Sequence, residues 1–214
     1  MSETHTKTGR PLTSRGQVTR DRIVSAAAAE IFARGVTATT LEHIKAAAGV
    51  SSSQLYHYFK DKDALVLAVI EHQAQAVLDG QEPELSRLDS LESLRAWRNR
   101  LVAGQRRARC VGGCPLGALS GQVSQTMPGA RLELVGGFNH WVTAIRHGLS
   151  TMHRRGELVE SADPERLATA TLAAVQGGLL LTQVTRKTAP LEAALDEMIA
   201  HIAALTRTPS AAAA

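Results

Sequence analysis

The stretch from residue 40 to residue 62 most constrains the fold of this 214-residue chain, because two short helical patterns meet there at one glycine. Leu41, Ile44 and Ala48 recur at the spacing that places side chains on one face of a helix. Gly49 follows, and glycine readily adopts the left-handed conformation that a sharp exit from a helix requires. The pattern therefore predicts two helices joined by a tight turn.

The second of these helices has an apolar inner face and a polar outer face. Ser51 is an N-cap candidate, and Leu55 and Phe59 are four residues apart on the inner face. Lys60 and Lys62 follow, near a helix start that also attracts phosphate. The outer face carries side chains that can hydrogen-bond to base edges and phosphates, namely Ser52, Ser53, Gln54, Tyr56, His57 and Tyr58. This layout is typical of a helix-turn-helix that reads duplex DNA, although any glycine turn between short helices shares part of it.

The same stretch resembles the signature of the TetR family of bacterial repressors, and the resemblance covers residues 18–70. The matching positions are Thr39, Thr40, Ile44, residues 47–51, residues 55–59, residues 62–65 and, in the preceding helix, Ile23, Ala26, Ala27, Phe32 and Gly35. The resemblance implies phosphate contacts from Thr40, Tyr58 and Lys62. It implies contacts in the DNA groove from Ser52, Ser53, Gln54, Tyr56 and His57.

Composition indicates an all-α fold of about nine helices. Hydrophobic residues make up 44% of the chain and aromatic residues only 3%, so helix formers are plentiful and strands are poorly supported. No apolar run looks long enough to span a bilayer, and the N-terminus lacks the apolar core of a secretory signal. We therefore expect a cytoplasmic protein without a membrane partner.

Positive charge is concentrated in the predicted DNA-reading segment. Through Lys62 the chain has nine Lys or Arg and five Asp or Glu, whereas the remainder has fifteen of each. The excess favours attraction to phosphate that weakens with salt, although an incidental basic tail would give the same count. The N-terminal arm could also place Arg10 or Arg15 in a minor groove when DNA is bound.

The chain divides into four predicted segments. Residues 1–17 form a flexible basic arm, and residues 18–62 form a three-helix helix-turn-helix domain. Residues 63–207 form a helical effector-binding and dimerisation domain, and residues 208–214 form a disordered tail. Within the third segment we expect helices over residues 62–79, 90–107, about 117–125, 130–155, 164–187 and 190–205.

The predicted helix at residues 164–187 is apolar over most of its circumference, so it either fills a core or is shared with another chain. Together with the last helix it could supply half of a four-helix bundle in a two-fold homodimer. Two reading heads about 34 Å apart would suit a near-palindromic operator. The family resemblance favours this dimer over a monomer in which both helices only complete the core.

The resemblance also implies that the C-terminal domain binds a small molecule and thereby alters the DNA-reading heads. We expect a small apolar or aromatic effector, with Gln176 as a polar anchor, although the same residues could be plain core. The candidate lining residues are Trp97, Leu101, Phe138, Trp141, Ile145 and Gln176.

Two cysteines and two histidines raise the question of a redox or metal-binding function. Cys110 and Cys114 flank two glycines, where a thiol switch or a metal site is conceivable, but packing as small hydrophobes is favoured. The GCPLG segment resembles the LmrA/YxaF-like branch of the family, whose members respond to drug-like or plant-derived aromatics. His140 and His147 lack a third ligand at useful spacing.

No pattern supports catalysis, and no metal or cofactor is expected. The sequence therefore predicts a ligand-responsive repressor rather than an enzyme. The alternative is a small-molecule-binding or enzymatic helical protein whose helix-turn-helix does not function.

Overall fold

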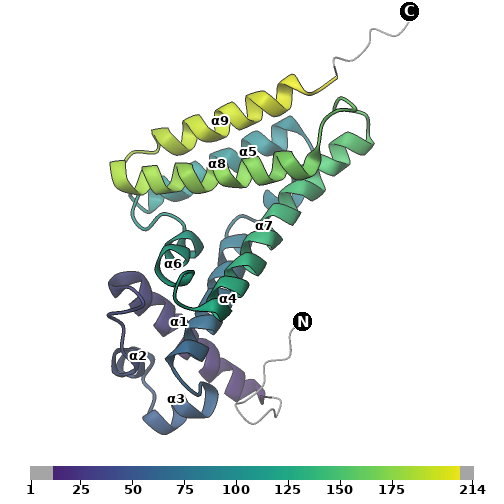
Figure 1. Cartoon of the computed structure of the whole chain (residues 1–214). Coiled ribbons are helices and arrows are strands. Elements are labelled where there is room, and N and C mark those ends of the chain that lie inside the picture. Colours follow the sequence, from purple (N-terminus) through teal and green to yellow (C-terminus); the bar gives the residue numbers. More distant parts are fainter. Residues whose placement is uncertain (1–11, 208–214) are drawn as a thin grey trace, which may run out of the picture. The chain divides into compact units, whose positions relative to one another are not determined.

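The computed structural model describes residues 12–207 and confirms the all-α fold. Within these residues the chain forms nine α-helices and one short 3₁₀ turn, and its only β-type pairing is an isolated bridge between Leu158 and Thr206 (Figure 1). Arg10 and the alanine-rich tail lie outside the described residues, so the predictions for them stay predictions.

The helices belong to two compact units. Unit 1 comprises residues up to 76 together with residues 118–137, and unit 2 comprises residues 77–117 together with the chain from residue 138 onward. Three helices, α4 (Lys62–Asp79), α6 (Pro115–Val123) and α7 (Pro128–Arg154), have residues in both units. The parts of these helices are described with the unit to which they belong.

Unit 1 is built around the three N-terminal helices α1 (Ser14–Arg34), α2 (Leu41–Ala48) and α3 (Ser52–Tyr58). The Thr13 hydroxyl accepts the Gly16 N–H and so caps α1. Helix α1 therefore begins inside the segment predicted as a flexible arm, and Arg15 is helical. The core of this unit is formed by apolar side chains of all three helices and of α4, including Ile23, Ile31, Ile44, Leu55, Phe59, Leu65 and Val69.

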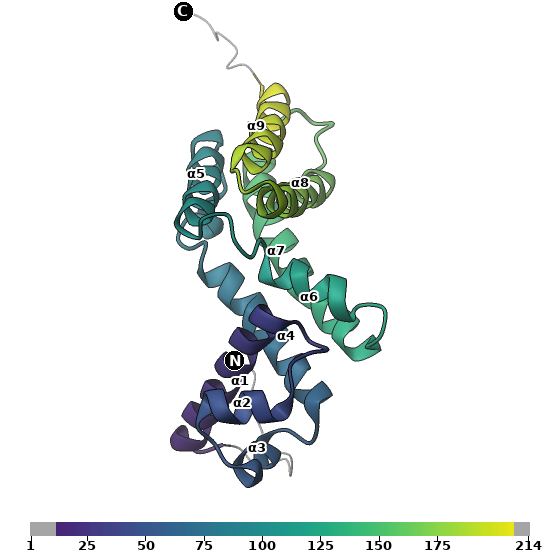
Figure 2. The same ribbon diagram turned by 90° about the vertical axis from the view of Figure 1, so that its left-hand side faces the viewer.

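Unit 2 is built from helices α5 (Leu91–Arg107), α8 (Pro164–Thr185) and α9 (Ala189–Ala204), most of α7, and the 3₁₀ turn η1 (Leu85–Arg87), which the sequence did not predict. Helices α8 and α9 lie side by side in both views (Figures 1 and 2). A Cβ at Gly178 of α8 would lie 2.9 Å from the Leu191 Cα, so their close packing requires glycine there.

The predicted starts of two helices in unit 2 are confirmed. The Ser90 hydroxyl accepts the Ser93 N–H at the start of α5, and the Asp163 carboxylate accepts N–H groups at the start of α8. These caps satisfy backbone donors that the first helical turn leaves without partners. Local residue chemistry therefore determines where both helices begin.

Helix α8 contradicts the prediction that no apolar run is long enough to span a bilayer. Among the described helices it alone is long and apolar enough, by length and composition, to cross a membrane, a property that core helices of soluble proteins share. Leu172, Val175 and other residues of α8 are buried in unit 2. The opposite face exposes three large apolar side chains, Leu180, Leu181 and Val184, which are 61%, 54% and 73% exposed.

Candidate nucleic-acid interface

Helices α2 and α3 are joined by the turn that the sequence predicted. Gly49 has φ 61° and ψ 43°, which is the left-handed conformation, and its N–H donates to the carbonyls of Lys45 and Ala46. The Val50 N–H donates to the same Lys45 carbonyl at 3.2 Å. These bonds satisfy the last carbonyls of α2 and fix the direction in which the chain enters α3.

Helix α3 is capped by reciprocal hydrogen bonds. The Ser51 hydroxyl accepts the Gln54 N–H at 3.2 Å, and the Gln54 side-chain oxygen accepts the Ser51 N–H at 2.9 Å. Leu55 and Phe59 are buried on the inner face, as predicted. A helix of only seven residues is therefore held by its caps and by two buried side chains.

The structure places most of the predicted DNA contacts on one exposed surface. Thr40, Ser52, Ser53, Gln54, Tyr56 and His57 are exposed, and Tyr58 is half-buried. The His57 and Tyr58 rings meet edge to face, with centroids 4.9 Å apart. The oxygen of the Gln54 amide accepts the Ser51 N–H in the cap, so a contact between Gln54 and DNA would use its NH₂ group as the donor.

Lys62 has a contact that the sequence did not indicate. Its ammonium donates to the Val36 carbonyl at 2.5 Å and lies 3.5 Å from the Thr37 carbonyl, so it stabilises the turn between α1 and α2. An ammonium has three N–H groups, so a phosphate contact would use the remaining donor. The side chain of Lys60, in contrast, is 67% exposed and lies 3.7 Å from Asp61.

Sequence reasoning missed two residues that position this surface. The Lys45 ammonium of α2 donates to the Ser52 hydroxyl of α3 at 2.6 Å and to Glu42 at 2.7 Å, so it links the two helices. The Gln122 side chain of α6 accepts the Val36 N–H at 2.7 Å. Gln122 and Val36 are 86 residues apart, so no local pattern could have paired them.

All six predicted effector-binding residues belong to unit 2, but their environments differ. The Trp97 indole N–H donates to Gln81 at 2.8 Å, which is the behaviour of a satisfied core residue. The Trp141 indole N–H is buried and has no hydrogen-bond partner within residues 12–207. The Gln176 NH₂ is also buried, and its contact is with the Cys114 thiol, a weak acceptor. Ile145 is buried, whereas Leu101 and Phe138 are half-buried.

The two cysteines are free and buried. Burial raises the pKa of the Cys114 thiol, and the Gly117 N–H donates to its sulfur at 3.4 Å. A higher pKa disfavours the thiolate, which is the reactive form. Within residues 12–207, no group of three or more His, Cys, Asp or Glu side chains could hold a metal ion.

Comparison with known proteins identifies this arrangement. A family profile described as bacterial regulatory proteins of the tetR family matches residues 23–69, which include the whole α2–α3 motif. A second profile, described as the tetracyclin repressor-like C-terminal domain, matches residues 90–198, about half of the chain. The chain belongs to the TetR family.

Relatives and solved structures agree with this assignment. The HTH-type transcriptional regulator in the lacX 3' region of Lactococcus lactis is 30% identical, over 83% of this chain and 90% of its own. The HTH-type transcriptional repressor DhaR of Mycobacterium sp. strain GP1 is 26% identical, over 81% of this chain and 86% of its own. A TetR transcriptional regulator from Chloroflexus aurantiacus J-10-FL superposes with a TM-score of 0.77 at 27% identity, covering 91% and 99% of the two chains.

The TetR assignment establishes a helix-turn-helix transcriptional regulator. Regulators of this family bind operator DNA, form dimers and have a ligand-binding C-terminal domain, and they are not enzymes. The finer resemblance of the GCPLG segment to the LmrA/YxaF-like branch is not supported by these comparisons and stays a prediction.

Proposed function

We propose that the protein is a homodimeric repressor that acts in the bacterial cytoplasm and leaves its operator when a small molecule binds. The observation that carries this proposal is the exposed polar face of α3, whose inner face is fixed in the core by Leu55 and Phe59. The proposed DNA contacts are Thr40, Ser52, Ser53, Gln54, Tyr56, His57, Tyr58 and Lys62. The relative DhaR is a transcriptional repressor, which supports repression rather than activation.

The proposed dimer interface is the exposed apolar stripe of α8, together with α9. Leu180, Leu181 and Val184 project from the face of α8 opposite its buried residues, and an exposed stripe of this kind marks an association surface. A two-fold arrangement would present two copies of α3 to successive turns of a near-palindromic operator.

Sedimentation of a double variant, Leu181→Lys with Val184→Lys, tests this interface. We expect the variant to sediment as a monomer, because burial of two ammonium groups without partners opposes association. Leu132→Lys, at an exposed apolar position of α7, is the control and should leave the mass of the dimer unchanged. A double variant that keeps the wild-type dimer mass would move the interface elsewhere.

The proposed effector is a small apolar or aromatic molecule that carries hydrogen-bond acceptors. This class follows from two buried donors of unit 2, the Trp141 N–H, which has no partner within the described residues, and the Gln176 NH₂, which has only the weakly accepting Cys114 thiol. Leu101, Phe138 and Trp97 complete the proposed lining, with Trp97 contributing its ring face because its N–H is already bonded.

Helix α6 is the proposed link between effector and DNA. Its first residues belong to unit 2, where Gly117 packs against Gln176: a Cβ on Gly117 would lie 2.9 Å from the Gln176 amide oxygen. Its last turn belongs to unit 1, where Gln122 bonds to Val36. An effector that prefers one placement of α6 would shift the population of DNA-binding conformers, since a ligand acts only through differential affinity.

Footprinting on the DNA upstream of the protein's own gene tests the regulator proposal. We expect a protected site of near-palindromic sequence, bound more tightly than a scrambled duplex of equal length, with an affinity that falls as salt increases. Equal affinity for both duplexes, or no binding, would favour the alternative of a helical small-molecule-binding protein with a non-functional helix-turn-helix.

A further inference from the structure

Unit 2 contains a basic groove that lies outside the proposed DNA surface and the proposed effector site. The groove has a volume of about 550 Å³ and lies where α5 ends, α8 ends and α9 begins. Its lining residues are Arg106, Arg109, Cys110, Arg186, Lys187, Thr188, Ala189 and Glu192. None of these residues belongs to the proposed DNA surface or the proposed effector site.

The charges in the basic groove are unbalanced. Four of the lining side chains are cationic, and Glu192 is the one carboxylate among them. That carboxylate is already engaged, because the Thr188 hydroxyl and the Arg106 guanidinium both donate to its Oε1 at 2.8 Å. These contacts, the Thr188 hydrogen bond foremost, lower the pKa of Glu192, so it is ionised near neutral pH.

The other three cations have no acidic partner within the described residues. Arg186 donates to the Cys110 carbonyl at 2.9 Å, which holds its guanidinium beside the end of α5. Arg109 and Lys187 are exposed, and no ion pair joins either of them to residues 12–207. Cations at the C-terminal ends of α5 and α8 also interact favourably with the helix dipoles. The experiment below therefore measures anion binding and not stability.

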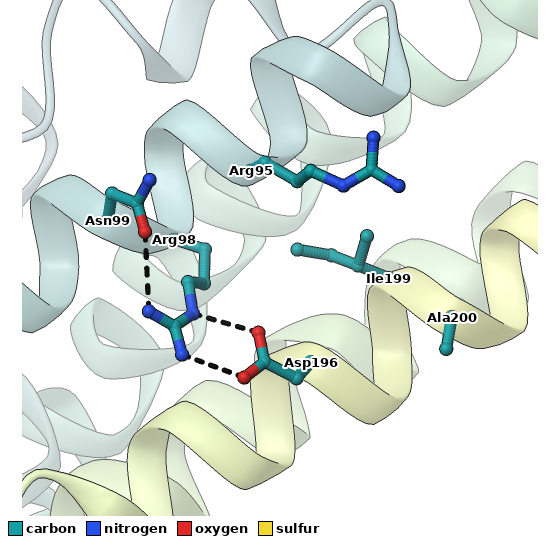
Figure 3. Close-up of a pocket in the computed structure, with 6 residues that line it drawn as sticks. All are labelled: Arg95, Arg98, Asn99, Asp196, Ile199 and Ala200. Carbon is teal, nitrogen blue, oxygen red and sulfur yellow. Dashed lines mark hydrogen bonds and ion pairs between the residues drawn. The ribbon is translucent and has the colours of Figure 1, made fainter.

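In a neighbouring hollow between α5 and α9, by contrast, an arginine is paired with a carboxylate. The volume of the hollow is about 290 Å³, and Figure 3 shows the Arg98 guanidinium facing the Asp196 carboxylate. Two hydrogen bonds of 2.8 and 2.7 Å join them, and Arg98 also donates to Asn99. An arginine held in this bidentate way has little capacity left for an external anion. Arg95 is thus the single cation of that hollow without an ion pair to the described residues, whereas the basic groove has three such cations.

The start of α9 adds a further donor to the basic groove. Thr188 is the N-cap residue but makes no side-chain cap bond, because its hydroxyl donates to Glu192. No side chain therefore caps the first turn of α9. Pro190 has no N–H, and the Glu192 N–H donates to the Thr188 carbonyl. The donor that this turn adds to the groove is therefore the N–H of Ala189, which lines it. Backbone N–H groups and cationic side chains together are the donors that oxyanions prefer.

We propose that the basic groove binds the oxyanion group, carboxylate or phosphate, of a small molecule. The groove is large enough for a small organic anion. Arg109 and Lys187 provide exposed cations, and Arg186 provides one whose guanidinium is held by the Cys110 carbonyl. This ligand differs in charge from the apolar effector proposed above, so the site goes beyond the proposed function and does not depend on it.

Calorimetric titration of the full-length protein with inorganic phosphate and, separately, with citrate tests the basic groove. Chloride at equal ionic strength serves as the blank, and the two titrations distinguish a phosphate ligand from a carboxylate ligand. The test variant is Arg109→Ala with Lys187→Ala, both at exposed positions. The control is Arg95→Ala with Arg154→Ala, which removes equal charge from exposed positions of unit 2 outside the groove.

We expect saturable binding of at least one anion by the wild-type protein and by the control. The test variant should bind it at least about ten-fold more weakly, since two charge-assisted contacts are lost. Anion binding at the DNA-reading surface would be the same in both variants, so it would not produce this difference. No saturable binding by the wild-type protein, or equal weakening in both double variants, would overturn the proposal.

Discussion

The DNA-reading surface and the interior of unit 2 treat polar groups in opposite ways. Around α3, Ser51 and Gln54 satisfy each other's backbone groups, and the remaining polar side chains are exposed. In unit 2, the side chains of Trp141 and Thr182 bury polar atoms that have no partner within the described residues. Buried polar groups are usually paired, so these atoms are the places in unit 2 where the proposed effector could form hydrogen bonds. The polar groups at the start of α3, in contrast, already have partners within the protein.

The largest expected effect comes from removing the core anchor of α3. Leu55→Ala should lower the free energy of unfolding by about 2–5 kcal/mol, because Leu55 is fully buried, and DNA binding should fall with it. Tyr56→Ala changes the next residue, which is 48% exposed, and should alter the free energy of unfolding by less than about 0.5 kcal/mol. Urea denaturation of both variants measures the contrast, and similar losses would mean that α3 does not have distinct inner and outer faces.

A smaller effect should separate the two tryptophans of unit 2. Trp97→Phe leaves the buried Gln81 oxygen without its donor, whereas Trp141→Phe removes a donor that has no partner. The same change of shape is made at both sites, so we expect Trp97→Phe to be more destabilising by about 1–3 kcal/mol. Thermal or urea unfolding gives this difference. Equal destabilisation would remove the reason for assigning Trp141, rather than Trp97, to effector hydrogen bonding.

The cap of α3 should contribute less than its core anchor. Ser51→Ala should lower the free energy of unfolding by about 1 kcal/mol, because the N–H of Gln54 loses its acceptor. Ser51→Thr keeps a hydroxyl at the same position and should restore most of that stability. If the alanine and threonine variants unfold alike in urea, the cap makes no measurable contribution.

The smallest effects are expected at the two lysines that follow α3. Lys60→Ala should lower the slope of log affinity against log salt by about 1, without loss of stability, because its side chain is exposed. Lys62→Ala should lower the slope by a similar amount and also destabilise the protein, because its ammonium is bonded to Val36. Operator titrations at several salt concentrations check both. An unchanged slope for Lys62→Ala would assign this residue to the α1–α2 turn alone.

Features that depend on neighbouring residues could be predicted from the sequence. The caps at Thr40, Ser51, Ser90 and Asp163 and the left-handed Gly49 are fixed by side chains within three residues of each helix end, so their chemistry is visible locally. The exposed outer face of α3 follows from the same local spacing.

Features that depend on residues far apart in the chain could not be predicted from the sequence. Lys62 and Gln122 both bond to Val36, at separations of 26 and 86 residues, and nothing near either residue indicates this partner. Trp97 and Trp141 have similar apolar spacing in the sequence. They differ only because Gln81, which lies between α4 and η1, reaches one of them. The basic groove likewise assembles the ends of three helices.

The proposed reading of operator DNA by the outer face of α3 is tested most directly by the operator affinity of a Tyr56→Ala, His57→Ala double variant. Both side chains are exposed, so we expect unchanged melting temperature and dimer mass. We expect operator affinity to fall at least about ten-fold, with much less change on scrambled duplex. Wild-type operator affinity in a folded, dimeric double variant would contradict the proposal.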